Sequence, residues 1–130
     1  MSLVPTGDDM EHGLSDDNRR RYARHLVLPS VGEEGQIKLL KSSVLVVGAG
    51  GLGSPAMMYL AAAGVGRIGI IDDDFVEESN LQRQVIHSTS SIGDSKAKSA
   101  AERISLLNPG INVFPMVDRL TESNALSVIK

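Results

Sequence analysis

The chain has 130 residues, of which 42% are hydrophobic and 22% charged, so it is long enough for one globular domain of ordinary composition. A net charge of -3 without a basic stripe gives no sign of a nucleic-acid or membrane partner, and no apolar stretch approaches the roughly 18 residues of a membrane span. The lack of cysteine excludes a disulfide framework, a thiolate metal site and a catalytic thiol within these residues, and it is compatible with the cytoplasmic location that we expect.

The first part of the chain predicts a lead-in segment followed by two short helices. Residues 1–14 are polar, contain glycine and lack periodicity, so we expect a flexible N-terminus. Residues 15–42 should hold the two N-terminal helices. The first helix is predicted to begin after the N-cap Ser15 and to run to Arg24, and the second to cover residues 36–41.

The remaining residues, 43–130, alternate between strand-like and helix-like patterns. Strands are predicted at residues 43–47, 67–72 and 111–117, and helices at residues 52–63, at residues 96–107 and from Thr121 onward. This order favours parallel strands joined by right-handed crossovers, which is a Rossmann-like α/β sheet flanked by helices. Such a half is usually part of a larger sheet, and the chain ends inside a predicted helix. We therefore expect the N-terminal portion of a longer protein.

Two of these elements are predicted to be covered on both sides. The short β-branched run of residues 43–47 is typical of a strand that is buried on both faces. The helix at residues 52–63 is rich in Met and Ala and has hardly any polar face. This composition favours a helix packed between two layers over one with a solvated side.

A glycine-rich turn connects the first predicted strand to the helix that follows it. Gly48, Gly50 and Gly53 form a G-x-G-x-x-G pattern. In such a turn the first glycine permits tight bending, the second lets the backbone approach a phosphate, and the third lets the helix pack closely. The pattern by itself would also fit a merely glycine-rich turn, but the flanking strand and helix favour a nucleotide-binding loop.

Three acidic residues end the second predicted strand. Asp72 follows Gly53 at about the 20-residue separation at which an acid accepts hydrogen bonds from ribose hydroxyls. We therefore predict ribose binding for Asp72. For Asp73 and Asp74 a solvated loop is favoured over metal ligation, so we predict no metal-binding residue in this chain.

Two cationic residues follow the carboxyl ends of strands, where ligands bind in open α/β sheets. Arg83 lies in the polar loop 79–83, and Lys96 opens a helix, where the helix dipole disfavours a cation. Each would be an ordinary surface charge if taken alone, but with Asn80 and the glycine turn they point to one phosphate chain. Because a triphosphate under attack benefits from more donors than a pyrophosphate does, ATP is favoured over a dinucleotide. His87 lacks a partner constellation, and we predict a packing or hydrogen-bonding role for it.

Five short motifs of this chain occur together in one known family. They occupy residues 21–25, 48–54, 63–66, 79–84 and 93–97, in the order and at the spacing of that family. From about Arg19 to Val117 the chain resembles the ThiF/MoeB/HesA family of adenylating enzymes, which are related to ubiquitin-activating E1 proteins. Within the family it looks most like molybdopterin-synthase adenylyltransferases and related sulfur-carrier activators.

The resemblance implies a reaction and a set of partners. Family members bind MgATP and adenylate the C-terminal glycine carboxylate of a ubiquitin-like sulfur carrier of the molybdopterin, thiamine or tRNA-thiolation type. The resemblance also implies a homodimer. The family's magnesium-binding aspartate, its paired zinc motifs and its carrier-binding surface lie beyond the matched region. We therefore expect this chain alone to adenylate poorly.

Roles for individual residues are implied by the same resemblance. The nucleotide-binding positions are Gly48, Gly50, Gly51, Gly53, Asp72, Ser79, Asn80, Leu81, Gln82, Arg83 and Lys96. Arg24 corresponds to the arginine that reaches the ATP of the partner subunit. Together with Arg83 and Lys96, Arg24 is expected to act in catalysis by stabilising charge. Residues 43–130 would then be the N-terminal part of an ATP-binding adenylation domain.

Two alternative functions remain open at this point. An NAD-binding oxidoreductase domain would use the same glycine turn, although Arg83, Lys96 and the loop 79–84 argue against it. A non-catalytic dimerisation or regulatory module would keep the fold without the reaction. ATP–pyrophosphate exchange in the presence of a carrier protein would exclude the second alternative.

Overall fold

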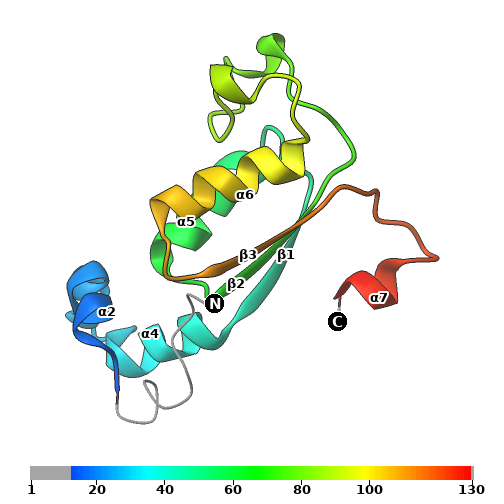
Figure 1. Cartoon of the computed structure of the whole chain (residues 1–130). Coiled ribbons are helices and arrows are strands. Elements are labelled where there is room, and N and C mark those ends of the chain that lie inside the picture. Colours follow the sequence, from blue (N-terminus) through cyan, green and yellow to red (C-terminus); the bar gives the residue numbers. More distant parts are fainter. Residues whose placement is uncertain (1–12, 130) are drawn as a thin grey trace.

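Three parallel strands form the centre of the structure. The computed structural model describes residues 13–129. Strand β1 (Ser43–Val47) pairs with β2 (Arg67–Ile71), and β2 pairs with β3 (Asn112–Met116), in the sheet order β1-β2-β3. The register is simple, because the first residues of the three strands lie opposite one another. The predicted Rossmann-like parallel sheet is therefore confirmed (Figure 1).

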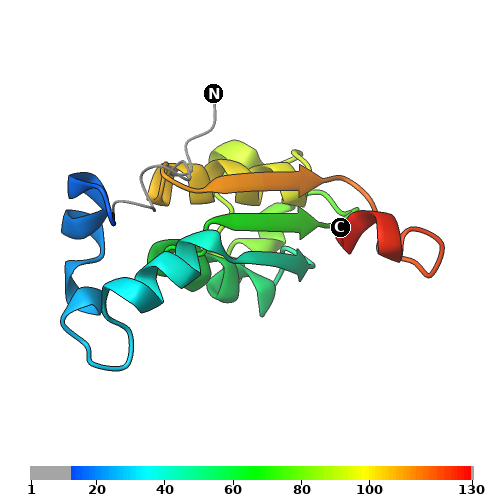
Figure 2. The ribbon, with the colours of Figure 1, turned by 90° about the horizontal axis from the view of Figure 1, so that it is seen from below.

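Two long helices make the connections between these strands. Helix α5 (Gly53–Ala63) joins β1 to β2, and helix α6 (Lys96–Leu107) joins β2 to β3. Both helices cover the same face of the sheet, as right-handed crossovers in one direction require (Figures 1 and 2). Two short 3-10 turns, Glu78–Asn80 and Thr89–Ser91, precede α6 in the long connection.

The hydrophobic core lies between this face of the sheet and the two helices. Helix α5 contributes Met57 and Ala61, β2 contributes Ile68 and Ile70, and α6 contributes Ile104, all of them completely buried. Burying a side chain as large as isoleucine or methionine contributes roughly 1.5–3 kcal/mol. Packing against this core is therefore what holds the two crossover helices on the sheet.

The outer surfaces of β1 and α5 correct two of the expectations from the sequence. The prediction that β1 is buried on both faces is wrong, because Val47 at its end is 59% exposed. The prediction that α5 is packed between two layers is also wrong, because Tyr59 on the helix and Leu52 at its N-cap are 78% and 91% exposed. The physical reason is the topology. Both crossovers run on one side of the sheet, so α5 belongs to an outer layer (Figure 1).

The N-terminal helices differ from the single predicted first helix. Ser15 caps α2 (Asp16–Arg21) as predicted, but the helix stops at Tyr22, and α3 (Ala23–Leu26) follows. The Tyr22 ring is buried, and its hydroxyl accepts a hydrogen bond of 2.8 Å from the side-chain amide of Asn108. The residue at the helix break therefore contacts a residue far along the chain.

Most other boundaries agree with the sequence prediction to within a few residues. Strand β1 and helix α6 begin and end as predicted, whereas α4 (Gly32–Lys41) begins before the predicted residue 36. Helix α7 begins at Ala125 rather than at Thr121. In the described structure the N–H of Thr121 donates to the side chain of Asn124 at 2.7 Å, which forms a turn in place of the first helical residues.

Two predictions concern the ends and the environment of the chain. The expected flexible segment, residues 1–14, lies outside the described residues except for its last two positions. Within residues 13–129 there is no helix with both the length and the apolar composition that crossing a membrane requires.

Candidate functional site

The glycine turn lies between the end of β1 and the start of α5. Gly48 has a φ of 96°, which an L-amino acid with a side chain rarely adopts. A Cβ atom on Gly53 would lie 2.1 Å from the carbonyl oxygen of Gly48, so the start of α5 approaches the turn too closely for any side chain. At Gly51 an added Cβ would meet nothing within 4 Å. The first and third glycines are therefore required by the backbone, as the pattern predicts.

The turn leaves backbone donors unpaired. No acceptor within residues 13–129 takes the N–H groups of Gly50, Gly51 and Leu52. These groups lie at the N-terminus of α5, where the helix dipole adds positive potential. Unpaired donors at such a helix end are the arrangement in which proteins bind phosphate.

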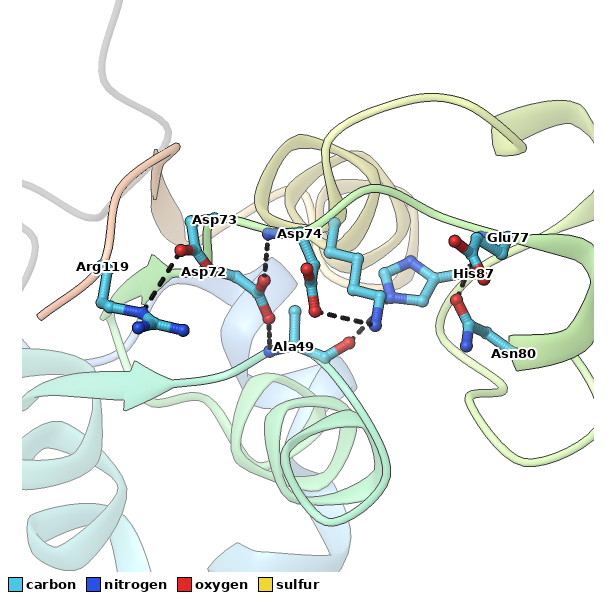
Figure 3. Close-up of polar contacts among 9 residues, drawn as sticks. Ala49, Asp72, Asp73, Asp74, Glu77, Asn80, His87 and Arg119 are labelled. Atoms are coloured by element: carbon cyan, nitrogen blue, oxygen red, sulfur yellow. Dashed lines mark hydrogen bonds and ion pairs between the residues drawn. The ribbon is translucent and has the colours of Figure 1, made fainter.

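Asp72 connects the end of β2 to the glycine turn (Figure 3). Its Oδ2 atom accepts a hydrogen bond of 2.7 Å from the N–H of Ala49, and its Oδ1 atom accepts one of 2.7 Å from the N–H of Asp74. Each carboxylate oxygen has a second lone pair. Asp72 therefore fixes the turn and still has the acceptor capacity that the predicted ribose contact needs.

Lys96 is brought close to these acids although it opens helix α6. Its side chain is only 10% exposed, and its ammonium nitrogen lies 3.8 Å from a carboxylate oxygen of Asp74. This separation is too long for a hydrogen bond, so the ion pair leaves the ammonium donors free for another acceptor. This position of Lys96 is compatible with the prediction that its ammonium group points to a phosphate.

The two arginines do not contact the glycine turn. The Arg83 guanidinium donates to the carbonyl oxygen of Ser79 at 3.2 Å and is exposed, so it folds back on its own loop. Arg24 is exposed on α3, at the amino end of the sheet (Figure 2), whereas the glycine turn follows the carboxyl end of β1. Within one chain, the length of the sheet separates Arg24 from the turn.

The rest of the predicted loop forms a compact turn rather than an open arm. Asn80 is buried, and its side-chain oxygen accepts a hydrogen bond of 3.0 Å from the N–H of Glu77, which caps the 3-10 turn (Figure 3). Ser79 and Gln82 are exposed, and Leu81 is half-buried. The Asn80 oxygen thus has a structural bond of its own, and Ser79 and Gln82 remain accessible.

His87 lies beneath the glycine turn and joins it to α6. Its Nε2 atom is 2.7 Å from the carbonyl oxygen of Ala49, and its Nδ1 atom is 2.7 Å from the hydroxyl of Ser99. Burial lowers the pKa of His87, and the nearby Lys96 adds to this, although the bond to Ala49 and the charge of Asp72 act in the other direction. The imidazole is therefore neutral at pH 7. The predicted hydrogen-bonding role of His87 is confirmed.

The sequence profile of the ThiF family matches residues 22–130. The chain belongs to the ThiF family. Over 124 residues it is 56% identical to the adenylyltransferase and sulfurtransferase MOCS3 of Arabidopsis thaliana, covering 95% of this chain and 27% of that protein. Over 117 residues it is 54% identical to the probable adenylyltransferase/sulfurtransferase MoeZ of Mycobacterium tuberculosis, covering 90% of this chain and 30% of that protein. The chain thus spans less than a third of the length of these two relatives.

A solved structure agrees with this assignment. The tRNA N6-threonylcarbamoyladenosine dehydratase TcdA of E. coli, in complex with ATP, superposes with a TM-score of 0.82 at 35% identity. The match covers 88% of this ThiF-family chain and 46% of the TcdA chain. The family resemblance and the Rossmann-like fold that the sequence predicts are both confirmed.

Two buried polar residues of this ThiF-family chain are missing from the sequence-based site. Gln84 packs against the glycine turn, where a Cβ on Gly50 would lie 3.3 Å from its side-chain nitrogen. The side-chain oxygen of Gln84 is buried and has no partner within residues 13–129. Ser54, in the first turn of α5, accepts a hydrogen bond of 3.0 Å from the N–H of Ile86. In the sequence, the polar Gln84 stands next to the apolar residues 85 and 86, which was the available sign that it is buried. Sequence periodicity does not show which residues a buried side chain contacts.

The acidic residues near the glycine turn do not form a metal site in the described part of the chain. Within residues 13–129 there is no group of three or more His, Cys, Asp or Glu side chains that could hold a metal ion. Asp73, which the sequence analysis weighed as a metal ligand, instead pairs with Arg119 at 3.3 Å (Figure 3).

Proposed function

We propose that this ThiF-family chain is part of an ATP-dependent adenylyltransferase that activates the C-terminal glycine carboxylate of a ubiquitin-like sulfur carrier. The names of the relatives MOCS3 and MoeZ, which both include adenylyltransferase and sulfurtransferase, support the reaction. The observation that carries the proposal is the glycine turn near the nearly buried Lys96, because three N–H groups of the turn have no acceptor within residues 13–129. A triphosphate needs both kinds of donor.

The proposed reaction transfers the adenylyl group to the carrier. A carboxylate oxygen of the carrier's terminal glycine attacks the α-phosphorus of ATP. A new bond forms between that oxygen and the α-phosphorus. The bond from the α-phosphorus to the bridging oxygen breaks, and pyrophosphate leaves with that electron pair. The products are an acyl adenylate and pyrophosphate.

We propose roles for the chain's own residues in this reaction. The N–H groups of Gly50 and Gly51 bind phosphate oxygens at the end of α5. Lys96 moves from Asp74 to the phosphates and offsets the negative charge that develops on the leaving group. Asp72 accepts hydrogen bonds from the ribose with its remaining lone pairs. Gly48 and Gly53 keep the turn in the required shape.

The loop before α6 is proposed to complete the nucleotide site. The exposed side chains of Ser79 and Gln82, with Leu81 between them, line the nucleotide, and Asn80 fixes the loop on the phosphate side. Arg83 leaves the carbonyl of Ser79 and binds a phosphate, where its planar fork pairs well with two oxygens. The exposure of Arg83 and its single weak bond of 3.2 Å support such a movement.

A homodimer is part of the proposal. Arg24 of one subunit would reach the nucleotide of its partner and stabilise charge in the transition state. The exposure of Arg24 and its distance from the glycine turn of its own chain support an action on another subunit (Figure 2).

Mg²⁺ is proposed only as the ion that accompanies ATP, since residues 13–129 contain no cluster of side chains that could hold it. A cytoplasmic location is proposed on the cysteine-free sequence.

The nucleotide preference is tested by binding. We expect MgATP, but not NAD, to raise the melting temperature of the chain. The variant Arg83→Ala should weaken MgATP binding by roughly 10- to 100-fold, the value of a charge-assisted hydrogen bond, and leave NAD binding nearly unchanged. Arg103→Ala, which removes an exposed charge from α6, is the matched control. Equal affinity of the wild-type chain for the two nucleotides would overturn the assignment.

The identity of the carrier is tested by ATP–pyrophosphate exchange. Radioactive pyrophosphate should enter ATP only slowly with this chain, which we expect to adenylate poorly alone, and faster when a carrier with a C-terminal glycine is added. Carriers of the molybdopterin, thiamine and tRNA-thiolation types are compared side by side. Stimulation by one of them would identify the substrate class. Exchange that does not depend on the terminal carboxylate of the carrier would contradict the proposed reaction.

A further inference from the structure

One peptide group of the glycine turn is held from inside the protein. The carbonyl oxygen of Ala49 lies 2.7 Å from Nε2 of His87. A carbonyl only accepts hydrogen bonds, so Nε2 carries the proton and Nδ1 accepts from the hydroxyl of Ser99 at 2.7 Å. Ala49 is completely buried, and His87 and Ser99 are 6% and 4% exposed. The bond is therefore shielded from water.

The orientation of this carbonyl determines the orientation of the next N–H group. The described residues contain no cis peptide bond, and in a trans peptide the C=O and N–H groups point in opposite directions. Because the Ala49 carbonyl points inward to His87, the N–H of Gly50 points outward. This N–H has no acceptor within residues 13–129.

A glycine at position 50 makes this orientation easy to lose. Rotation of the Ala49–Gly50 peptide changes the φ of Gly50, and glycine adopts positive and negative φ with similar ease. A rotated peptide would direct a carbonyl oxygen, instead of an N–H, at a phosphate. A donor on the inner side is what excludes the rotated form.

We propose that His87 is a positioning residue that holds the Ala49–Gly50 peptide so that the N–H of Gly50 donates to a nucleotide phosphate. The proposal rests on the proposed function only in taking a phosphate as the ligand of the turn. His87 acts through Ala49 and does not touch the nucleotide. Asp72 holds the preceding peptide through the N–H of Ala49, so both sides of Ala49 are fixed before the nucleotide binds.

The binding test compares two replacements of His87. His87→Leu removes the donor, and His87→Gln keeps an N–H near the position of Nε2. We expect His87→Leu to bind MgATP roughly 10- to 100-fold more weakly, the loss of one hydrogen bond to a charged group, and His87→Gln to recover most of the affinity. Binding of adenosine, which lacks phosphates, should stay within about twofold of the wild type in both variants. Ser91→Ala, which removes another buried hydroxyl from the same connection, should behave as wild type.

The outcomes separate this proposal from the proposed function. If the wild-type chain binds MgATP and His87→Leu binds it equally well, the positioning role is wrong and the function stands. If the wild type does not bind MgATP, the proposed function fails. The inner bond is then read without nucleotide from the ¹⁵N chemical shifts of the His87 ring, which should show a protonated Nε2 and an unprotonated Nδ1. The opposite tautomer would overturn the positioning role in either case.

Discussion

The two ends of the sheet differ in whether their polar groups have hydrogen-bond partners. At the amino end, His25 lies 2.7 Å from the side-chain oxygen of Gln36, whose amide donates to the carbonyl of Ala63 at 3.0 Å. Asn108 donates to both Tyr22 and the carbonyl of Ala61, each at 2.8 Å. These bonds attach the N-terminal helices to the C-terminal ends of α5 and α6, and they give each of these side chains at least one partner.

The carboxyl end keeps polar groups unused. The N–H groups of residues 50–52 have no acceptor in residues 13–129. Gln84, whose side-chain oxygen is the one described buried side-chain polar atom without a partner, packs its side-chain nitrogen against Gly50. The nearly buried Lys96 has one ion-pair partner in the described part of the chain, Asp74 at 3.8 Å. The buried Gln84 oxygen and the nearly buried Lys96 ammonium reduce stability, whereas the N–H groups of residues 50–52 are accessible at a helix N-terminus, where anions bind. Their position together at one end of the sheet indicates a ligand site. The comparison assigns stability to one end of the sheet and binding to the other.

The largest expected effect is on stability at the amino end. A Cβ on Gly66 would lie 1.8 Å from the carbonyl oxygen of Leu40, so Gly66→Ala forces backbone apart where α4 meets the sheet. We expect the free energy of unfolding to fall by about 3 kcal/mol. Gly51→Ala, where an added Cβ meets nothing, should change it by less than about 0.5 kcal/mol. Urea titrations measure both, and equal stability of the two variants would contradict the assignment.

A second effect should appear in binding rather than in stability. Lys96→Gln should weaken MgATP binding by about 10- to 100-fold, because it removes a charged donor from the phosphate site. Asp74→Asn should act in the opposite direction and strengthen binding a few-fold, because it removes a negative charge that competes for Lys96. Isothermal calorimetry at low salt measures the two affinities. A loss of affinity in Asp74→Asn would mean that Asp74 assists the nucleotide and does not compete with it.

The smallest effect should be a pH dependence that comes from His87. Burial lowers its pKa from 6.5, so between the folded and unfolded pKa values the unfolded chain binds more protons than the folded chain. The free energy of unfolding therefore decreases as the pH falls through 6.5 and stops decreasing below the folded pKa. His87→Gln lacks this titration. Urea unfolding at several pH values between 7.5 and 5 should show a steeper decrease for the wild type, and parallel curves would refute the prediction.

The sequence predicted those features that depend on neighbouring residues. The bounds of β1 and α6 follow from local periodicity, and the turn from Gly48 to Gly53 follows from backbone geometry that only glycine permits. The parallel order of strands follows from the alternation of strand and helix. The family resemblance added the nucleotide-binding roles, which remain proposals for the individual residues.

What the sequence did not predict depends on contacts between distant residues. The helix break at Tyr22 is paired with Asn108, and the bond of His87 to Ala49 likewise joins separate segments. The exposed outer side of α5 depends on what packs over that helix, which local composition does not specify. The direction of the Arg83 side chain depends on a bond to Ser79 that the spacing of charges does not indicate.

The parallel pairing of the strands also has a consequence for the order of folding. Pairing β1 with β2 brings residue 43 to residue 67, whereas pairing β2 with β3 brings residue 67 to residue 112, a loop nearly twice as long. Because the entropy lost on loop closure grows with loop length, the unit β1-α5-β2 should close first. The nucleotide turn is then formed before β3 docks. Chevron analysis would show this order, since substitutions in α5 should slow refolding while substitutions in β3 mainly accelerate unfolding.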